Sequence, residues 1–354
     1  MVDSPSDYEL LASIVLVEIS SAFSVFGSGS IMYLIGMESK WRHSFFHRIM
    51  MGVCLADLIF SVGNMMHPFM LPSDTGLLYA FGNAVTCNIA GFLIPTLSSS
   101  MLYSCILSTY FFLTITRGWN EEKATRAFEP WIHIAIWGSQ ILPASLMFVL
   151  GGYAPSELRI CSAVRGDEAH KMAQVVVSIA HAVAVLSAVA GFVLIWLMYV
   201  GVRRQRLRIQ RYHIPSSLDT SDRDNQTKAV ATQAVFYSLA FLNTFIAIVV
   251  FGVAQAIVEN RTAGGHNMFR HGRVFFYSTL PFYFTLPLQG FLNWIIYIRP
   301  NLMRWKNANE EKSLLWAYKK LLSGEAVPKI GTSASGSVSI RGAFVLEPGS
   351  NDNA

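Results

Sequence analysis

Long apolar runs, each bounded by charged residues, dominate the hydrophobic pattern of this chain. A helix that crosses a bilayer core about 30 Å thick needs about 20 apolar residues, and seven runs are long enough. Membrane barrels instead show alternating runs of about ten residues, which are absent here. The pattern therefore predicts an all-α membrane protein that is a bundle of seven transmembrane helices. The predicted spans are Leu10–Met37, Ile49–Pro72, the last part of Thr75–Thr116, Pro130–Gly152, Met172–Val202, Ala229–Val258 and Val274–Ile298.

The composition agrees with a membrane protein. Of the 354 residues, 53% are hydrophobic and only 14% are charged, whereas soluble domains carry about a quarter charged residues. The 24 Phe, 13 Tyr and 8 Trp exclude disorder over most of the chain. The formal net charge is +5, but the basic residues form no face on a polar domain, so we expect no nucleic-acid partner.

Lysine and arginine predict how the chain is oriented in the membrane. Of the 27 Lys and Arg, 21 follow spans one, three, five and seven, and six lie on the opposite side. The positive-inside rule therefore places the N-terminus outside and the C-terminus in the cytosol, as an odd number of crossings requires. We expect a multi-pass protein of the plasma membrane. Residues 1–9 would be a short extracellular N-terminus and residues 10–298 the transmembrane domain.

The segment after span seven carries apolar residues at helical spacing with lysines between them. Residues 299–322 are therefore predicted to be a cytosolic amphipathic helix on the inner leaflet, with membrane lipids as its partner. Residues 323–354 are rich in Ser and Gly and are predicted to be a disordered cytosolic tail. The apolar positions are Leu314, Leu315, Tyr318, Leu321 and Leu322, and the lysines are Lys312, Lys319 and Lys320.

Four cysteines allow three complete disulfide pairings. Cys87 lies near the outer end of span three and Cys161 lies in the outer loop after span four, so only these two share an oxidising compartment. We predict a Cys87–Cys161 disulfide, and the alternative is two separate free thiols. Cys54 and Cys105 lie inside spans, where they would pack as small apolar residues.

Asp57 is the one acid deep in a span after the first. A carboxylate in lipid costs at least ~2.5–3.5 kcal/mol, so Asp57 must face the interior of the bundle. At 1.5 Å per residue, Asp57 and Asn293 lie roughly 12 Å and 7.5 Å from the inner ends of their spans. A shared switch network filled by water or a cation is predicted, and the alternative is structural interhelical hydrogen bonding, worth about 0.6 kcal/mol per contact. The other candidate members are Ser28, Ser30, Asn64 and Tyr297.

The outer halves of the spans hold polar and aromatic residues that would line a ligand cavity. Each of them could instead make an ordinary interhelical hydrogen bond. These residues are His67, Gln140, His181, Gln255, Tyr277 and Tyr283. The third outer loop also contains the glycosylation sequon Asn260-Arg261-Thr262.

Several of these segments resemble motifs of G-protein-coupled receptors. Residues 55–58 read Leu-Ala-Asp-Leu, Trp137 stands where the fourth helix of these receptors has Trp, and Cys87 with Cys161 matches their disulfide pattern. Asn293 and Tyr297 keep the spacing of the receptor Asn-Pro-x-x-Tyr motif. The run Gln-Gly-Phe-Leu-Asn at 289–293, followed by Tyr and Arg-Pro, is similar to the cyclic-AMP-receptor-like branch.

The resemblance implies a cell-surface receptor that carries a signal from an extracellular small-molecule ligand to an intracellular transducer, a heterotrimeric G protein. It implies no catalytic residue, no cofactor and no metal. The residues that would face the transducer are Arg117 at the end of span three and Arg203, Arg204, Arg206 and Arg208 in the third inner loop.

The chain departs from the family at several places, among them Trp294, which replaces the proline of the Asn-Pro-x-x-Tyr motif, and span five, which has no proline. The Asp-Arg-Tyr motif is missing, because residues 108–114 read Ser-Thr-Tyr-Phe-Phe-Leu-Thr. Span six has no Cys-Trp-x-Pro motif and no proline. Span seven has no lysine, which excludes a retinal Schiff base there.

Two other classes of function compete with a receptor. A transporter or channel would show internal repeats and broken helices, and no repeat is visible. A membrane-embedded metal-dependent hydrolase needs several His or acidic ligands at one depth. His43 and His47 have suitable spacing, but they lie on an inner loop without a third partner.

Overall fold

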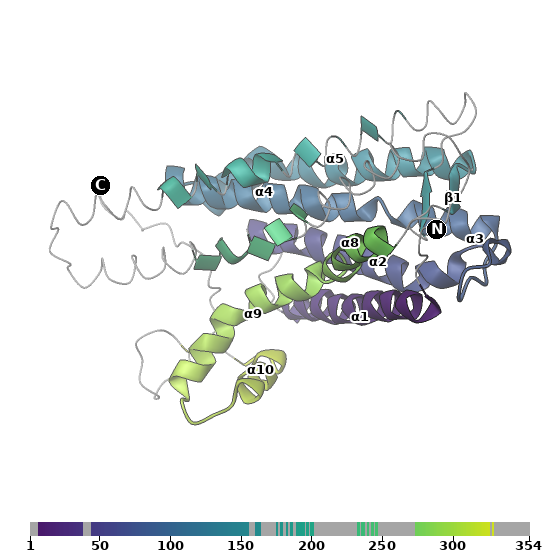
Figure 1. Cartoon of the computed structure of the whole chain (residues 1–354). Coiled ribbons are helices and arrows are strands. Elements are labelled where there is room, and N and C mark those ends of the chain that lie inside the picture. Colours follow the sequence, from purple (N-terminus) through teal and green to yellow (C-terminus); the bar gives the residue numbers. More distant parts are fainter. Residues whose placement is uncertain are drawn as a thin grey trace, which may run out of the picture.

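The computed structural model describes residues 6–37, 44–155, 160–163, 273–325 and 328, with parts of 175–201 and 232–246. Helices α1, α2, α4 and α5 lie side by side along the length of the molecule (Figure 1). The elements are α1 (Asp7–Met37), α2 (Phe45–Met70), η2 (Ser73–Thr75), α3 (Ala84–Leu93), α4 (Thr96–Arg117), α5 (Glu121–Val149), β1 (Tyr153–Pro155), β2 (Cys161–Ala163), α8 (Arg273–Thr285), α9 (Gln289–Ala308) and α10 (Leu314–Leu322).

Within these residues, four helical segments are long and apolar enough to cross a membrane: α1, α2, α3 with α4, and α5. They coincide with the first four predicted spans except at their ends. Helix α5 begins at Glu121, nine residues before the predicted span, because Asn120 caps it by accepting a 3.0 Å hydrogen bond from the Lys123 amide. Hydropathy marks only the part of a helix that faces lipid, whereas the cap marks where the helix begins.

Two of the predicted spans are interrupted in the structure. Span three is divided into α3 and α4 at Pro95, and span seven is divided into α8 and α9 around Pro287. Proline has no N–H to donate and its ring clashes with the preceding turn, so it ends a regular helix. The break in span three is closed locally, because Thr96 Oγ1 donates a 2.6 Å hydrogen bond to the Leu93 carbonyl.

The segment after span seven differs from the single amphipathic helix that the sequence predicts for 299–322. Helix α9 continues through Pro300 to Ala308, and α10 then folds back beside it (Figure 1). Lys306 stabilises the turn by donating to the Glu310 carbonyl and, at 2.8 Å, to the Lys312 carbonyl. Helices of membrane proteins tolerate proline more readily than soluble ones do, so the proline at position 300 does not mark the end of α9.

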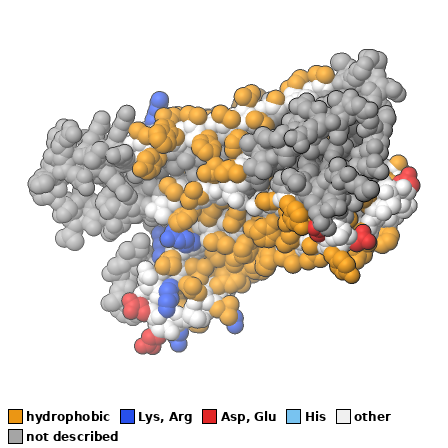
Figure 2. Space-filling view, viewed as in Figure 1, with side chains coloured by type: hydrophobic (Ala, Val, Ile, Leu, Met, Phe, Trp, Pro, Cys, Tyr) orange, Lys and Arg blue, Asp and Glu red, His pale blue; other side chains and the backbone are white. Residues whose placement is uncertain are grey.

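On the face that Figure 2 shows, hydrophobic side chains cover most of the described part of the bundle, and charged side chains gather towards its two ends. On α5, for example, Trp131 and Leu142 are each 72% exposed and Val149 is 80% exposed. A water-soluble monomer rarely shows so large an apolar surface. The exposed apolar helices identify the chain as an integral membrane protein.

Helix α1 packs through a face of small residues. Gly27 lies directly against the backbone of Gly290 and Phe291, where a Cβ atom would come within 2.7 Å of the Gly290 carbonyl oxygen. Small residues let helix backbones approach closely where lipid supplies no hydrophobic driving force. The buried serines of α1 are Ser13, Ser20, Ser21, Ser24 and Ser28.

Candidate functional site

Asp57 of α2 is the centre of a polar contact between three helices. Ser100 Oγ of α4 donates a 2.6 Å hydrogen bond to Asp57 Oδ1, and Asn293 Nδ2 of α9 donates a 2.9 Å hydrogen bond to Asp57 Oδ2. The three side chains are at most 3% exposed. Each carboxylate oxygen therefore accepts one hydrogen bond from a neutral donor. Such hydrogen bonds lower the cost of burying a carboxylate, but they add no opposite charge.

The start of α9 is fixed to α1 next to this contact. The break at Pro287 leaves the first amides of α9 without a partner in their own helix. Ser24 Oγ of α1 accepts a 3.1 Å hydrogen bond from the Gly290 amide. Gly290 is needed here, because a Cβ atom would lie 2.2 Å from Ser28 Oγ and 2.5 Å from Ser24 Oγ.

At the opposite end, a disulfide joins Cys87 of α3 to Cys161 of β2, as predicted. Strands β1 and β2 form an antiparallel hairpin in which Pro155 pairs with Cys161. The buried ring of His67 on α2 accepts a 2.7 Å hydrogen bond from the Cys161 amide through Nε2. The hairpin is thus held to two helices, by a covalent bond to α3 and by a hydrogen bond to α2.

Tyr153 gives the hairpin a third attachment. Its ring packs against Gly91 of α3, where a Cβ atom would lie 2.4 Å from the ring, and its hydroxyl donates a 3.4 Å hydrogen bond to the Ala144 carbonyl. Burial raises the pKa of Tyr153 to about 12. The phenol consequently keeps its proton, and the hydroxyl stays a donor at every physiological pH.

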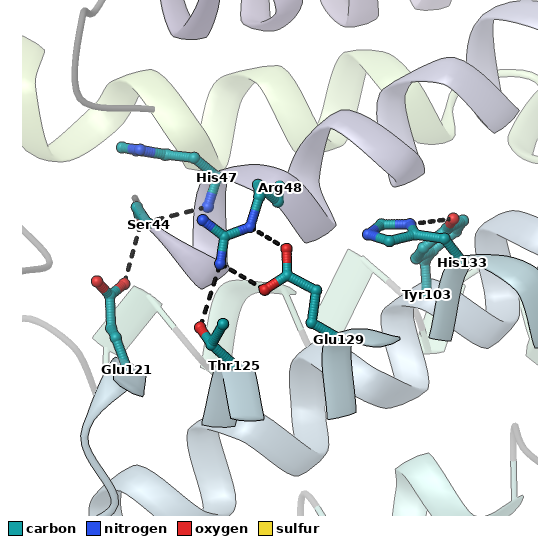
Figure 3. A network of polar contacts seen from close by, with 8 residues as sticks. All are labelled: Ser44, His47, Arg48, Tyr103, Glu121, Thr125, Glu129 and His133. Atoms are coloured by element: carbon teal, nitrogen blue, oxygen red, sulfur yellow. Dashed lines mark hydrogen bonds and ion pairs between the residues drawn. The ribbon is translucent and has the colours of Figure 1, made fainter. Parts of the chain in front are cut away.

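A polar seam joins α2 to α5 at the other end of these helices (Figure 3). The Arg48 guanidinium contacts both carboxylate oxygens of Glu129; its Nη2 donates to Oε2 at 2.6 Å and to Thr125 Oγ1 at 3.1 Å. One turn earlier, Ser44 Oγ donates to Glu121 Oε1 at 2.9 Å. The Arg48 and Glu129 side chains are only 16% and 23% exposed, so this forked pair is much stronger than a surface pair.

The spacing of the residues explains why they face each other. On each helix, the seam residues recur at every fourth position and so form one stripe along the surface. The stripes are Ser44, Arg48 and Gly52 from the start of α2 and Glu121, Thr125, Glu129 and His133 on α5.

Tyr103 of α4 is inserted between the two stripes. Its hydroxyl and His133 Nδ1 form a 2.8 Å hydrogen bond (Figure 3). Its fully buried ring lies against Gly52, where a Cβ atom would come within 2.6 Å. A larger residue at position 52 would displace the ring, so the seam couples α4 to α2 and α5.

The predicted switch residues lie at different places. Asn293 meets Asp57, but Tyr297 stacks on Phe46, with ring centroids 6.4 Å apart. Ser28 Oγ is buried without a hydrogen-bond partner among the described residues. Asn64 donates within its own helix and Ser30 lies 3.5 Å from the hydroxyl of Tyr318, so neither contacts Asp57.

The predicted ligand residues do not converge in the part of the chain that the structure describes. His67 binds the hairpin, and Gln140 is buried with Nε2 3.2 Å from Ser139 Oγ. Tyr277 donates a 2.5 Å hydrogen bond to Glu9, and Tyr283 is half-buried. The predicted residues outside the described ranges are His181, Gln255, Asn260, Arg203, Arg204, Arg206 and Arg208.

Arg117, the remaining residue predicted to face the transducer, is exposed at the end of α4. Among the described residues, no group of three His, Cys, Asp or Glu could hold a metal ion. The expectation that the protein has no metal or cofactor stays a prediction.

Sequence reasoning missed three of the contacts described above: Ser100 with Asp57, Ser24 with Gly290, and Arg48 with Glu129. A serine in an apolar helix gives no signal, because it also hydrogen-bonds its own backbone. Arg48 and Glu129 did carry a signal. Their recurrence at four-residue intervals with Ser44 and Glu121 would have indicated two matching stripes.

Comparison with known proteins establishes the fold. The crystal structure of squid rhodopsin is similar to this chain, with a TM-score of 0.62 over 84% of this chain and 83% of that chain. The chain has the seven-helix fold of rhodopsin. The two sequences are only 15% identical, so the likeness concerns the fold alone. No protein-family model and no curated protein matches the sequence. The predicted seven-helix bundle is confirmed, and the cyclic-AMP-receptor-like branch stays a prediction.

Proposed function

We propose that this chain is a cell-surface receptor that passes an extracellular signal to an intracellular transducer, with a heterotrimeric G protein as the partner. The observation that carries the proposal is the contact of Asp57 with Ser100 and Asn293, inside a seven-helix fold. A buried carboxylate that accepts hydrogen bonds from two other helices is sensitive to small helix movements. A movement that breaks one of these bonds leaves a carboxylate oxygen without its donor. Such a centre can bias two arrangements of the bundle.

The proposed orientation places the hairpin and the disulfide outside the cell and the polar seam at the cytosolic end. It is supported by the distribution of Lys and Arg and by the disulfide, which belongs to an oxidising compartment. In this orientation the ligand enters near the hairpin. The transducer meets the end of α4 at Arg117 and the third inner loop, where Arg203, Arg204, Arg206 and Arg208 lie.

The proposed role of Asp57 is to hold water or a monovalent cation that is released when the helices rearrange. The carboxylate has one donor on each oxygen, and each oxygen retains a further acceptor site. Ser28 Oγ of α1 faces Gly290, three residues before Asn293, and is buried without a partner among the described residues. It would supply a further oxygen to the same interior water.

The proposal is tested by measuring nucleotide exchange on a panel of G-protein α subunits, using membranes that contain the full chain. Candidate small molecules are added one at a time, and sodium is replaced by potassium in a parallel series. Exchange that depends on a compound and changes with sodium supports the proposal. Sustained solute flux through liposomes carrying the purified chain, with no exchange on any α subunit, would contradict it and favour a transporter.

A further inference from the structure

The loop between α2 and α3 has a polar part followed by an apolar part. The polar part carries η2 and the exposed side chains of Ser73 and Asp74. The apolar part, residues 76–82, reads Gly-Leu-Leu-Tyr-Ala-Phe-Gly and contains no charged residue. Loops that lie in water are normally polar, because both their backbone and their side chains are solvated. The apolar part of this loop is therefore expected to meet a surface other than water.

A strained turn shapes the apolar part. The Ala80 amide donates a 3.2 Å hydrogen bond to the Leu77 carbonyl, so Leu78 and Tyr79 are the central residues of a β-turn. Tyr79 has a φ of 62°, in the left-handed region that favours glycine, and no other non-glycine residue of the described ranges has a positive φ. Because glycine would adopt this conformation without strain, the tyrosine indicates that its side chain has a role of its own.

The turn separates inward from outward side chains. Ala80 is 8% exposed and belongs, with Leu71, to the buried cluster around the disulfide. Tyr79 and Phe81, on either side of Ala80, are 40% and 73% exposed. Their rings meet edge to face, with centroids 6.4 Å apart. The disulfide cluster therefore supports the inner side of the loop, while two aromatic rings are displayed together on its outer side.

Backbone hydrogen bonds fix the depth of the loop relative to α2. The Phe81 amide donates a 3.4 Å hydrogen bond to the Phe69 carbonyl, and the next amide along the chain donates one of 2.8 Å to the Leu71 carbonyl. Phe69 lies roughly 30 Å along α2 from Ile49, where the predicted span begins, and this distance equals the thickness of the hydrocarbon core. Phe81 thus lies at the level where acyl chains give way to headgroups, and aromatic residues are enriched at that level.

The loop joins two helix ends whose side chains face lipid. Phe69 of α2 is 45% exposed, and Val85 and Ile89 of α3 are 66% and 40% exposed. Both helices belong to segments that are long and apolar enough to cross a membrane. Val85 and Ile89 are four residues apart, so they form one face of α3, on the side away from the buried Cys87. The apolar part of the loop therefore continues the lipid-facing surface of the bundle, at the end where β1 lies (Figure 1).

We propose that Leu78, Tyr79 and Phe81 anchor the loop in the membrane leaflet on the disulfide side, with the two rings at the boundary between headgroups and acyl chains. Tyrosine suits this place, because its ring packs on acyl chains while its hydroxyl stays among the headgroups. The polar part of the loop, with Asp74, remains in water. Because Ala80 packs against the disulfide cluster, the anchor sets the height of the disulfide above the membrane.

The test measures how deep spin labels on this loop lie in the bilayer, using the full chain in phosphatidylcholine nanodiscs. Labels are attached at Phe81→Cys and Leu78→Cys, and the matched control is Asp74→Cys in the polar part of the same loop. Cys54 and Cys105 are replaced by alanine, and peptide mapping verifies that the disulfide remains in each variant. Each label is exposed in turn to oxygen, which concentrates in hydrocarbon, and to a nickel chelate, which stays in water.

We expect the labels at positions 78 and 81 to collide mainly with oxygen and the label at position 74 to collide mainly with the nickel chelate. Equal collision ratios at positions 81 and 74 would overturn the anchor. A label at position 81 that is shielded from both reagents would overturn it as well, because another protein surface would then cover the loop. None of these outcomes depends on nucleotide exchange, so the anchor and the receptor proposal fail in separate measurements.

A second measurement uses the chain without labels. Phe81→Ser should speed hydrogen exchange in the peptide that contains the Gly82 amide about tenfold, which corresponds to about 1.4 kcal/mol. Asp74→Ser should leave this exchange unchanged, because that side chain lies in water. Unchanged exchange in Phe81→Ser would show that the ring makes no stabilising contact with the membrane, and it would contradict the anchor.

Discussion

The backbone amide of Cys161 donates a 2.7 Å hydrogen bond to Nε2 of His67, which lies 94 residues earlier in the chain. Both groups are buried. His67 must therefore be neutral with its proton on Nδ1, because a protonated Nε2 could not accept. One imidazole nitrogen thus determines how the hairpin that carries the disulfide sits against α2.

Replacing His67 by leucine should loosen the hairpin. The buried Cys161 amide would lose its acceptor, which costs about 1–3 kcal/mol. Hydrogen exchange in the peptide that contains β2 should become faster, whereas exchange in α5 should not change. His67→Gln restores an acceptor oxygen at a similar distance and should recover part of the protection. Identical exchange in the Leu and Gln variants would show that the hydrogen bond is unimportant.

The two disulfide cysteines should behave as one unit. Cys87→Ser and Cys161→Ser remove the same bond, so each should lower the melting temperature of the purified protein by the same amount. The double variant should be no worse than either single one. Losing a native disulfide costs ~2–5 kcal/mol in small secreted domains. Clearly additive losses would mean that the two thiols contribute separately.

Asp57 and Asn293 should couple in function. Asp57→Asn keeps the shape of the side chain but removes its charge, so the protein should fold, reach the surface, and lose the sodium dependence of nucleotide exchange. Asn293→Ala should give much less additional change in that background than alone, because partners in one network couple by ~0.5–3 kcal/mol. Ser100→Ala should resemble Asn293→Ala, since both supply one hydrogen bond to the carboxylate. Independent effects would assign Asp57 a purely structural role.

The Arg48–Glu129 pair should contribute more than a surface ion pair. A double-mutant cycle with Arg48→Ala and Glu129→Ala, read by thermal unfolding, should give a coupling energy of about 1.5–3 kcal/mol, as for hydrogen bonds to charged groups. The matched control is Arg126 with Glu122 on the same helix, whose side chains are 78% and 68% exposed. That pair should couple by only about 0.3–0.5 kcal/mol. Equal coupling in the two cycles would contradict the interpretation.

Gly290 should not tolerate even alanine. The new Cβ atom would overlap Ser28 Oγ and Ser24 Oγ, and overpacking of this kind costs about 1–3 kcal/mol. Gly29→Ala is the control, because nothing lies within 4 Å of its Cβ position. That substitution should leave stability unchanged or raise it slightly. Melting temperatures of the two variants in one detergent decide the matter, and equal values would refute the close contact.

The spans could be predicted from the sequence because lipid imposes one simple requirement, a long apolar helix. The same criterion missed the breaks at Pro95 and Pro287, because a count of apolar residues does not show where a helix is interrupted. Apolar patterning also did not predict that α9 continues to Ala308, because a helix can extend beyond the membrane where a cap and local hydrogen bonds stabilise its end.

The candidate site was predictable only in part. Asp57 is conspicuous because charge in lipid is costly, and depth alone suggested Asn293 as its partner. Ser100 was hidden among many serines that serve their own helices. Arg48 was interpreted only as an orientation signal. Charges near helix ends were counted individually, so the pairing of Arg48 with Glu129 on a neighbouring helix remained invisible.

The disulfide described above also makes residues 87 to 161 a closed covalent ring. The ring contains most of α3, all of α4 and α5, and the turn between Arg117 and Glu121. A single protease cut after the exposed Arg117 would open the ring without releasing a fragment. The two pieces would migrate together on a gel run without reductant and separate only after reduction. A backbone break between α4 and α5 would therefore be hidden in any measurement of molecular size made without reductant.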